Sequence, residues 1–234
     1  MNGKLIDISG KKIYNQSSYV KRIIVIIALA IVAIMIFLQL INIIFANLSV
    51  KKLTQYVEDG ELNKIALVSY DRDQLMYDEY AAILDGTIDD PVNKKKNEIL
   101  SEIYKQNIID SEFVFPLFFS TEVTLEIKSI DMEKVLTELL EDVTENTTQE
   151  EFSEMFIQKI TTAKQDKLSK VTLPMKLTTN GWVIDTENNK FRDSISGGLY
   201  TSYATMYEST RSKVYSELEQ YMANNSSVEE ANQD

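Results

Sequence analysis

The chain has 234 residues, with 24 basic and 36 acidic side chains, and it contains neither cysteine nor histidine. These absences exclude disulfides, Ser-His and Cys-His nucleophile systems, and histidine-based metal sites. Residues 47–234 hold 19 of the basic and 35 of the acidic side chains, a net charge of −16. Such a surface repels phosphate backbones, so we expect no nucleic-acid partner.

Residues 23–46 form an apolar run without a charge, between Lys21-Arg22 and Lys51-Lys52. As a helix these 24 residues would span roughly 36 Å, enough to cross a hydrocarbon core about 30 Å thick. The run is longer than the apolar region of a secretory signal peptide, which has about 7–15 residues. It therefore predicts a permanent transmembrane helix.

The basic residues around this run predict its orientation. Residues 1–22 carry five of them, against two just after the run, and the more basic side stays in the cytoplasm. We expect a single-pass protein of the cell membrane with a basic cytoplasmic leader over 1–22 and a transmembrane helix over 23–46. An extracellular domain over 47–223 and a disordered acidic tail over 224–234 would follow.

Two amides, Gln39 and Asn42, interrupt the far end of the apolar run. One interpretation places both at the membrane interface, bonded to water or lipid headgroups. The other is association with a second transmembrane helix, in which such bonds contribute only about 0.6–2 kcal/mol.

Helical spacing dominates residues 48–108. A first segment over 48–70 is broken at Asp59-Gly60. A second is capped by Asp73 and ends at Asp85-Gly86, and a third opens at Asp89-Asp90-Pro91.

The pattern then alternates between apolar and polar residues, as in strands. Residues 113–117 and 121–128 both alternate, although Pro116 marks an edge or bend in the first. Asp131 is a candidate N-cap for a helix reaching residue 143. Residues 147–150 (Thr-Thr-Gln-Glu) fit a capping box that opens a further helix.

Residues 171–184 carry the clearest strand signal. Val171, Leu173, Met175 and Leu177 alternate with polar residues, and Asn180-Gly181 predicts a type I′ hairpin turn before a strand that begins with Trp182. Pro174 suggests an edge strand or a bulge. With a last helix over 199–222, the pattern predicts an α+β fold, in which helices pack on a curved antiparallel sheet.

Several of these residues carry a resemblance. They are the VTLEIK run from Val123, Asp131, the VTLPMKL run from Val171, the GWVID run from Gly181, and Gly197-Gly198-Leu199. Together they resemble a family of Gram-positive membrane-anchored or lipoprotein surface proteins, defined only by a domain of unknown function. The resemblance implies a cystatin-like, nuclear transport factor 2-like cone into which the tryptophan packs. This chain differs in carrying a transmembrane anchor and no lipobox cysteine.

No catalytic or cofactor motif is present. Asp71-Arg72-Asp73 and Asp89-Asp90 lack the spacing of a calcium loop, and Gly197-Gly198 is better explained as a turn than as a nucleotide motif. We therefore expect no metal, no cofactor and no enzymatic activity.

The candidate partner-binding residues are tyrosines of the last predicted helix. Tyrosine is common in binding hot spots, whereas at helical spacing it also packs against a core. The residues are Tyr200, Tyr203, Tyr207 and Tyr215, with Tyr221 beyond them.

Three functions fit these observations. The first is a membrane-anchored extracellular module that binds a protein, a peptide or an envelope component without catalysis. The second is a structural subunit of a multiprotein envelope or conjugative secretion assembly, by analogy of layout alone. The third is a cone-fold enzyme that uses a carboxylate pair.

Overall fold

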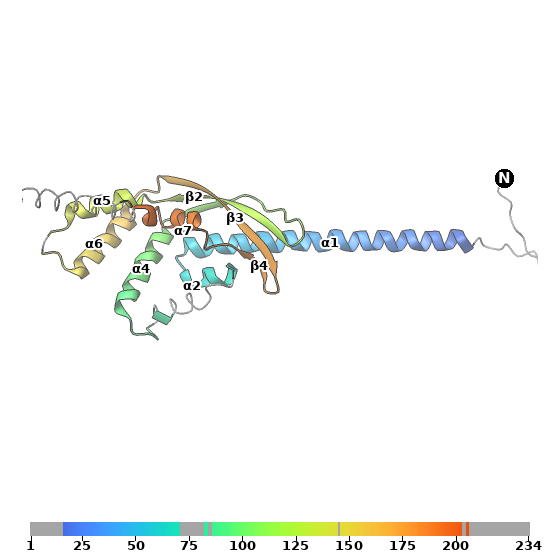
Figure 1. The fold of residues 1–234 in the computed structure, drawn as a ribbon, viewed down its shortest axis with the longest axis horizontal. Helices are drawn as coiled ribbons and strands as arrows, with labels where there is room; N and C mark the ends of the chain where they lie inside the picture. The colour runs from blue at the N-terminus through green and yellow to red at the C-terminus, as the bar shows by residue number, and fades with distance from the viewer. Residues whose placement is uncertain (1–15, 71–81, 84–85, 145, 203–204, 206–234) are drawn as a thin grey trace, which may run out of the picture.

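The fold is organised around one long helix, α1, which spans Gln16–Glu58 (Figure 1). The computed structural model describes residues 16–70, 82–83, 86–144, 146–202 and 205. The predicted segments 23–46 and 48–58 are therefore parts of the same helix, and the predicted boundary between residues 46 and 47 lies inside it. Gly60, at φ 68°, ends the helical path as predicted, because glycine adopts this left-handed conformation without a steric cost.

The N-terminal half of α1 stands apart from the rest of the domain (Figure 1). It belongs to the one helix of the described residues that is long and apolar enough to cross a membrane, and its most apolar window is unburied. The C-terminal half enters the domain core through Ala46, Val50, Leu53 and Val57.

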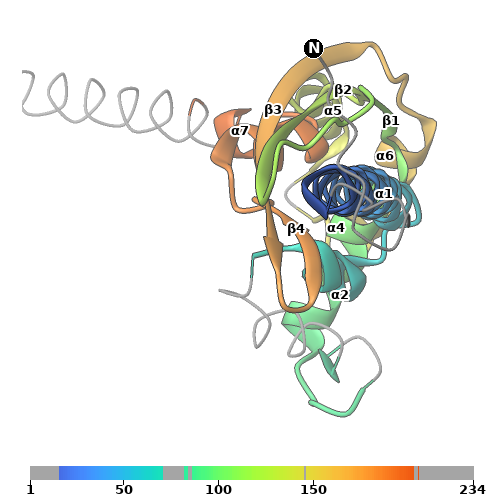
Figure 2. The same cartoon turned by 90° about the vertical axis from the view of Figure 1, so that its right-hand side faces the viewer.

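The sheet has four antiparallel strands in the order β1-β2-β3-β4. They are β1 (Ile108–Ser111), β2 (Ser120–Ser129), β3 (Lys167–Thr178) and β4 (Gly181–Ile184). Viewed along α1, the strands curve around the helix (Figure 2). Val123, Leu125 and Ile127 of β2 are buried together with Val171, Leu173 and Met175 of β3. The structure thus confirms an α+β fold with a curved antiparallel sheet.

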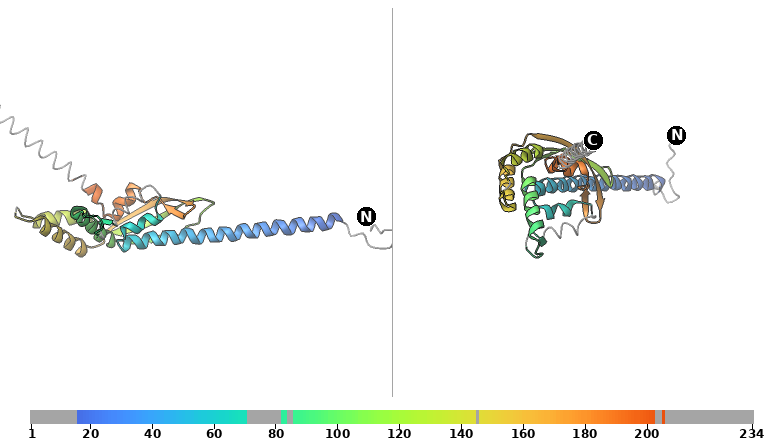
Figure 3. Two further views of the ribbon diagram at one scale, coloured as in Figure 1. Left: turned by 90° about the horizontal axis from the view of Figure 1, so that it is seen from below. Right: turned by 60° about the vertical axis from the view of Figure 1, so that its left-hand side comes forward.

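The remaining helices complete the domain. They are α2 (Leu62–Ile65), the 3-10 helix η1 (Ala66–Val68), α4 (Pro91–Lys105), α5 (Met132–Asp142), α6 (Gln149–Thr162) and α7 (Asn189–Ile195). Helices α5 and α6 lie at the end of the domain farthest from the apolar half of α1 (Figure 3). The opposite end of the domain, where loops and strand ends meet α1, is the one nearest to the apolar half of the helix.

Two predicted helix caps are confirmed and one is shifted. Asp90 accepts from the backbone N–H of Asn93 and Asp131 from that of Glu133. The capping box belongs to Thr148 and Glu151, one residue later than predicted. Thr147 instead bonds back to Thr144 through its hydroxyl, so the helix begins only after it.

The predicted hairpin is present, but its turn is of another type. Thr178 pairs with Gly181, so the two turn residues are Thr179 and Asn180. Gly181 has φ 108°, and Asn180 is not among the described residues with positive φ. A glycine at positive φ after an ordinary turn forms a bulge that restores strand pairing, which replaces the predicted type I′ turn.

Pro174 lies in an interior strand of the sheet, not in an edge strand. Its side chain is exposed as predicted, and it pairs with Glu122 of β2. The Pro174 carbonyl accepts from Asp185 N at 2.9 Å, so its backbone polar groups face β4, which has already ended at Ile184. The missing N–H of proline therefore breaks no ladder bond with β2.

Residues 113–117 are not a strand. The strand before β2 is β1, and residues 112–119 form the loop that joins them. Phe113, Phe115 and Leu117 are exposed, and the Pro116 ring cannot donate to a ladder. The alternation that predicted a strand over residues 113–117 therefore does not correspond to a buried strand face.

Some predictions fall on residues that the structure does not describe. They concern the leader over 1–15, most of the helix capped by Asp73, and the tail over 224–234. Of the last predicted helix, residues 199–202 and 205 are helical, and the rest lies outside the described residues.

Gly197 offers a direct test of the core geometry. It has φ 67°, and a Cβ there would overlap the carbonyl oxygen of Ile130. We expect Gly197→Ala to destabilise the domain by about 2–5 kcal/mol, from left-handed strain and overpacking together. Urea unfolding of the full chain in detergent micelles, followed by Trp182 fluorescence, measures this loss.

Gly86→Ala is the matched control for Gly197→Ala. Gly86 has φ 82° but open space around its Cβ position, so only the conformational cost of about 1–2 kcal/mol remains. Equal losses in the two variants would show that close packing at Gly197 is absent.

Candidate binding groove beside helix α1

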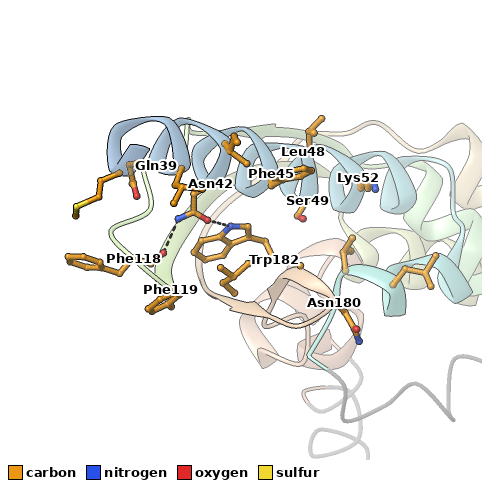
Figure 4. Close-up of a pocket in the computed structure, with 17 residues that line it drawn as sticks. Gln39, Asn42, Phe45, Leu48, Ser49, Lys52, Phe118, Phe119, Asn180 and Trp182 are labelled. Carbon is orange, nitrogen blue, oxygen red and sulfur yellow. Dashed lines mark hydrogen bonds between the residues drawn. The ribbon is translucent and has the colours of Figure 1, made fainter. Parts of the chain in front are cut away.

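A groove lies between α1 and the edge of the sheet, at the point where the helix emerges from the domain (Figure 4). Its volume is about 840 Å³, within the usual range for ligand sites. The walls come from α1, from the loop before β2, from the β3–β4 hairpin and from η1. Its residues are Met35, Leu38, Gln39, Ile41, Asn42, Phe45, Leu48, Ser49, Lys52, Leu67, Val68, Phe118, Phe119, Leu177, Asn180, Gly181 and Trp182.

Asn42 is the polar centre of the groove. Its side-chain N–H donates to the Phe118 carbonyl at 2.9 Å, and its amide oxygen accepts from Trp182 Nε1 at 2.8 Å (Figure 4). One amide thus joins helix, loop and hairpin. Trp182 is only 3% exposed, so its ring is packed inside the domain as predicted, with its N–H facing the helix.

Gln39 makes a similar contact from the preceding turn of α1. Its side-chain nitrogen donates to the carbonyl of Pro116. Both amides of the apolar run therefore bond to backbone carbonyls of their own chain, which neither sequence interpretation proposed. The reason is that the loop before β2 reaches back along α1 to residues within the predicted span.

The charge in the groove lies toward the domain. Lys52 and Ser49 line it on α1, while Met35 and Leu38 line it on the apolar side. Near the hairpin, the Lys176 ammonium lies 4.1 Å from the centre of the Tyr70 ring. Burial, and secondarily the charge of Asp185, raise the pKa of the Tyr70 phenol, so it is neutral at physiological pH. The groove thus combines apolar walls with a positive end.

The predicted tyrosine face is only partly within the described residues. Tyr200 is 53% exposed and borders a separate hollow with Asn189, Arg192 and Asp193, none of which lines the groove. Tyr203, Tyr207, Tyr215 and Tyr221 lie outside the described residues. The structure therefore does not test whether these tyrosines share a face.

Within the described portion of the chain, no three acidic side chains gather closely enough to hold a metal ion. Asp90, one of the residues considered for calcium, caps α4, and its bonds to Asn93 hold the pKa of its carboxyl below the usual range. Helix capping therefore explains the presence of Asp90 at this position without a bound calcium ion. The expectation of no metal and no cofactor stays a prediction.

Sequence reasoning found the individual components of the groove but not the groove itself. Gln39 and Asn42 were notable as amides in an apolar run, and Trp182 as a large residue of the sheet. The chain separation between Asn42 and Trp182, 140 residues, hides their contact. The signal that could have joined them is that each carries a polar group in an apolar setting, and such groups require partners.

No protein-family model and no curated protein matches the chain. A solved structure of a protein assigned as a lipoprotein (ycdA) from Bacillus subtilis subsp. subtilis str. 168 is partly similar, with 13% identity and a TM-score of 0.37. The likeness covers 54% of this chain and 46% of the Bacillus protein, so the chain matches less than half of the length of that protein. The specific family predicted from the sequence stays a prediction.

Asn42→Leu tests the polar centre of the groove. The change leaves the Trp182 N–H and the Phe118 carbonyl without their partner, so we expect a loss of about 1–3 kcal/mol in domain stability. Urea unfolding in micelles measures the loss, and the emission of Trp182, the one tryptophan of the chain, should shift in the native state. Met35→Leu, on the same helix but without loss of a polar group, should change neither the stability nor the Trp182 emission. If Asn42→Leu has the stability and emission of the unaltered chain, the hydrogen bonds described for Asn42 are contradicted.

Proposed function

We propose that this protein is a single-pass, membrane-anchored extracellular binding module that holds an envelope component in the groove beside α1 and catalyses no reaction. The observation that carries the proposal is the position of the groove. It is lined by the helix that contains the apolar run and by the sheet edge next to it. A ligand bound there would contact the membrane helix and the domain at once.

Membrane anchoring is supported by the unburied apolar half of α1. The orientation is supported by the five basic residues of the leader, which favour a cytoplasmic N-terminus. The acidic domain would then lie outside the cell, joined to the membrane by a continuous helix.

The lining of the groove favours an amphiphilic ligand. Phe45 and Leu48 offer exposed apolar surface, and Met35 and Leu38 extend it toward the span. Lys52 and Ser49 lie at the other end, where an ammonium and a hydroxyl can bind an anionic head. The ligand class is therefore an apolar chain with an anionic head, oriented with the head away from the bilayer centre.

The finer fold identity belongs to the same proposal. A curved antiparallel sheet with helices on it is compatible with a cystatin-like, nuclear transport factor 2-like cone, and such cones carry binding sites on the concave side. Here α1 fills much of that side through Leu53 and Val57, both fully buried. The groove lies beside α1 at the hairpin end of the sheet, where Leu177 and Gly181 line it.

Reversing the charge of Lys52 tests the ligand class. Bromine atoms on a short-chain phosphatidic acid quench tryptophan, so saturable quenching of Trp182 in uncharged micelles reports binding in the groove. We expect Lys52→Glu to weaken this binding about tenfold, since a charge-assisted bond is replaced by repulsion. Lys51→Glu is the matched control, because Lys51 is exposed but does not line the groove. Equal weakening in both variants, or quenching that never saturates, would refute the assignment.

The orientation has a separate test that uses the cysteine-free chain. Single cysteines are introduced as Lys164→Cys in the domain and Lys11→Cys in the leader. A membrane-impermeant maleimide applied to intact cells should label position 164 and spare position 11, which should react only after lysis. The opposite pattern would show that the domain faces the cytoplasm.

A further inference from the structure

The loop between β1 and β2 exposes an unusual concentration of apolar side chains. Phe113, Phe115, Leu117, Phe118 and Phe119 are between 61% and 75% exposed, and no charged residue occurs from 113 to 119. Scattered exposed apolar residues are ordinary, but a contiguous cluster indicates a contact surface. We propose that this aromatic loop, residues 112–119, inserts into the outer leaflet as a second membrane contact. The proposal rests on the membrane anchoring proposed above.

The aromatic loop follows α1 toward the apolar run. Val114 exchanges two hydrogen bonds with the side chain of Asn47, at 2.9 and 2.8 Å. Two residues later, the Pro116 carbonyl is bonded to Gln39, and the Phe118 carbonyl then returns to Asn42. From Asn47 to Gln39 the helix rises about 12 Å. The tip of the loop, Pro116 and Leu117, therefore reaches farthest along the predicted span.

The position of the bilayer along α1 follows from its flanking charges. Between Lys21 and Lys51 the helix rises about 45 Å, which matches a bilayer of about 40–45 Å with its headgroups. If a hydrocarbon core of about 30 Å is centred midway between Lys21 and Lys51, its outer end lies near Ala46. If the core instead begins at Ile23, directly after Arg22, it ends near Asn42. In both placements Gln39 is inside the core, and the tip of the loop lies at its depth.

Several backbone polar groups of the loop have partners inside the protein. In hydrocarbon, polar backbone groups need internal partners. Here both backbone groups of Val114 bond to Asn47, and the Phe119 carbonyl accepts from Leu177 N at 2.8 Å. The carbonyls of Pro116 and Phe118 have the two amides of the span, and Pro116 has no N–H to satisfy. A loop in water would not need side-chain amides for these carbonyls.

Two further features fit insertion. Phe118 has φ 63°, a rare conformation for an aromatic residue; its carbonyl bonds to Asn42 while its side chain stays 75% exposed. The nearest charge, Glu112, pairs with Lys170 at 2.8 Å at the root of the loop. The aromatic side chains therefore face outward without a neighbouring charge, beside the unburied face of the span, and the outer leaflet is the medium that surrounds that face.

The experiment uses the full chain in phospholipid nanodiscs, with single cysteines carrying an environment-sensitive fluorophore. Reporters are Phe113→Cys, Phe115→Cys and Leu117→Cys, with Leu168→Cys as the matched control, because Leu168 is 61% exposed at the other end of β3. Ile31→Cys reports the span independently. Each is quenched in turn by spin-labelled lipids and by a water-soluble quencher, and unchanged Trp182 emission confirms the fold of each variant.

If the loop inserts, quenching by the spin-labelled lipids should increase from position 113 to 115 to 117, and quenching by the water-soluble reagent should decrease in the same order. Position 168 should be quenched by the water-soluble reagent and not by the lipids. Aqueous quenching of the loop while position 31 stays in lipid would overturn the insertion and leave the anchor intact. Shielding of the loop from both quenchers would mean that protein covers it, which also overturns the proposal. If the fluorophore at position 31 is quenched by the water-soluble reagent and not by the lipids, the membrane anchor itself is refuted.

Hydroxyl-radical footprinting of the unaltered chain in the same nanodiscs provides a second measurement without substitutions. The phenylalanines of the aromatic loop should be protected from oxidation, whereas Tyr200, which is 53% exposed and outside the loop, should react. Oxidation of the loop at the level of Tyr200 would contradict insertion.

Discussion

The structure depends on one packing interaction, the burial of the C-terminal half of α1 in the concave side of the sheet. Ala46 and Leu53 are fully buried there, against strands that contribute Leu125 and Leu173. Burial of a leucine side chain stabilises by about 1.5–3 kcal/mol. Without the helix, the sheet would expose its apolar face, so the segment that continues the apolar run is also part of the core of the domain.

This shared helix explains why the groove has both polar and apolar regions. Helix α1 passes from its unburied apolar half into contacts with the rest of the domain over a few turns, and its polar side chains need partners along that stretch. Gln39, Asn42 and Asn47 do so with carbonyls of the aromatic loop, and Asn42 also accepts from Trp182. The same bonds fix the loop and the hairpin at the point where α1 leaves the domain.

The elements defined by local patterns were predictable, and the contacts between them were not. The alternation of Val123, Leu125 and Ile127 and the cap at Asp131 predicted β2 and α5 because each signal lies within a few residues. The segment around Phe115 alternates equally well, yet it is a loop, because it bonds along α1 to residues more than 60 positions away, a contact that no local pattern reveals. The groove joins positions far apart in the chain, so only the folded arrangement of Asn42, Phe118 and Trp182 defines it.

The continuity of α1 through residue 58 has a mechanical consequence. No break in α1 separates the unburied apolar turns from those packed in the sheet, so the domain cannot pivot relative to the apolar half of the helix. A tilt of the helix is a tilt of the whole body, and a rotation about its axis sweeps the sheet edge across the plane of the leaflet. In a membrane, a mismatch between the apolar helix and the bilayer thickness, which tilting can relieve, would then also change the angle at which this domain faces its surroundings.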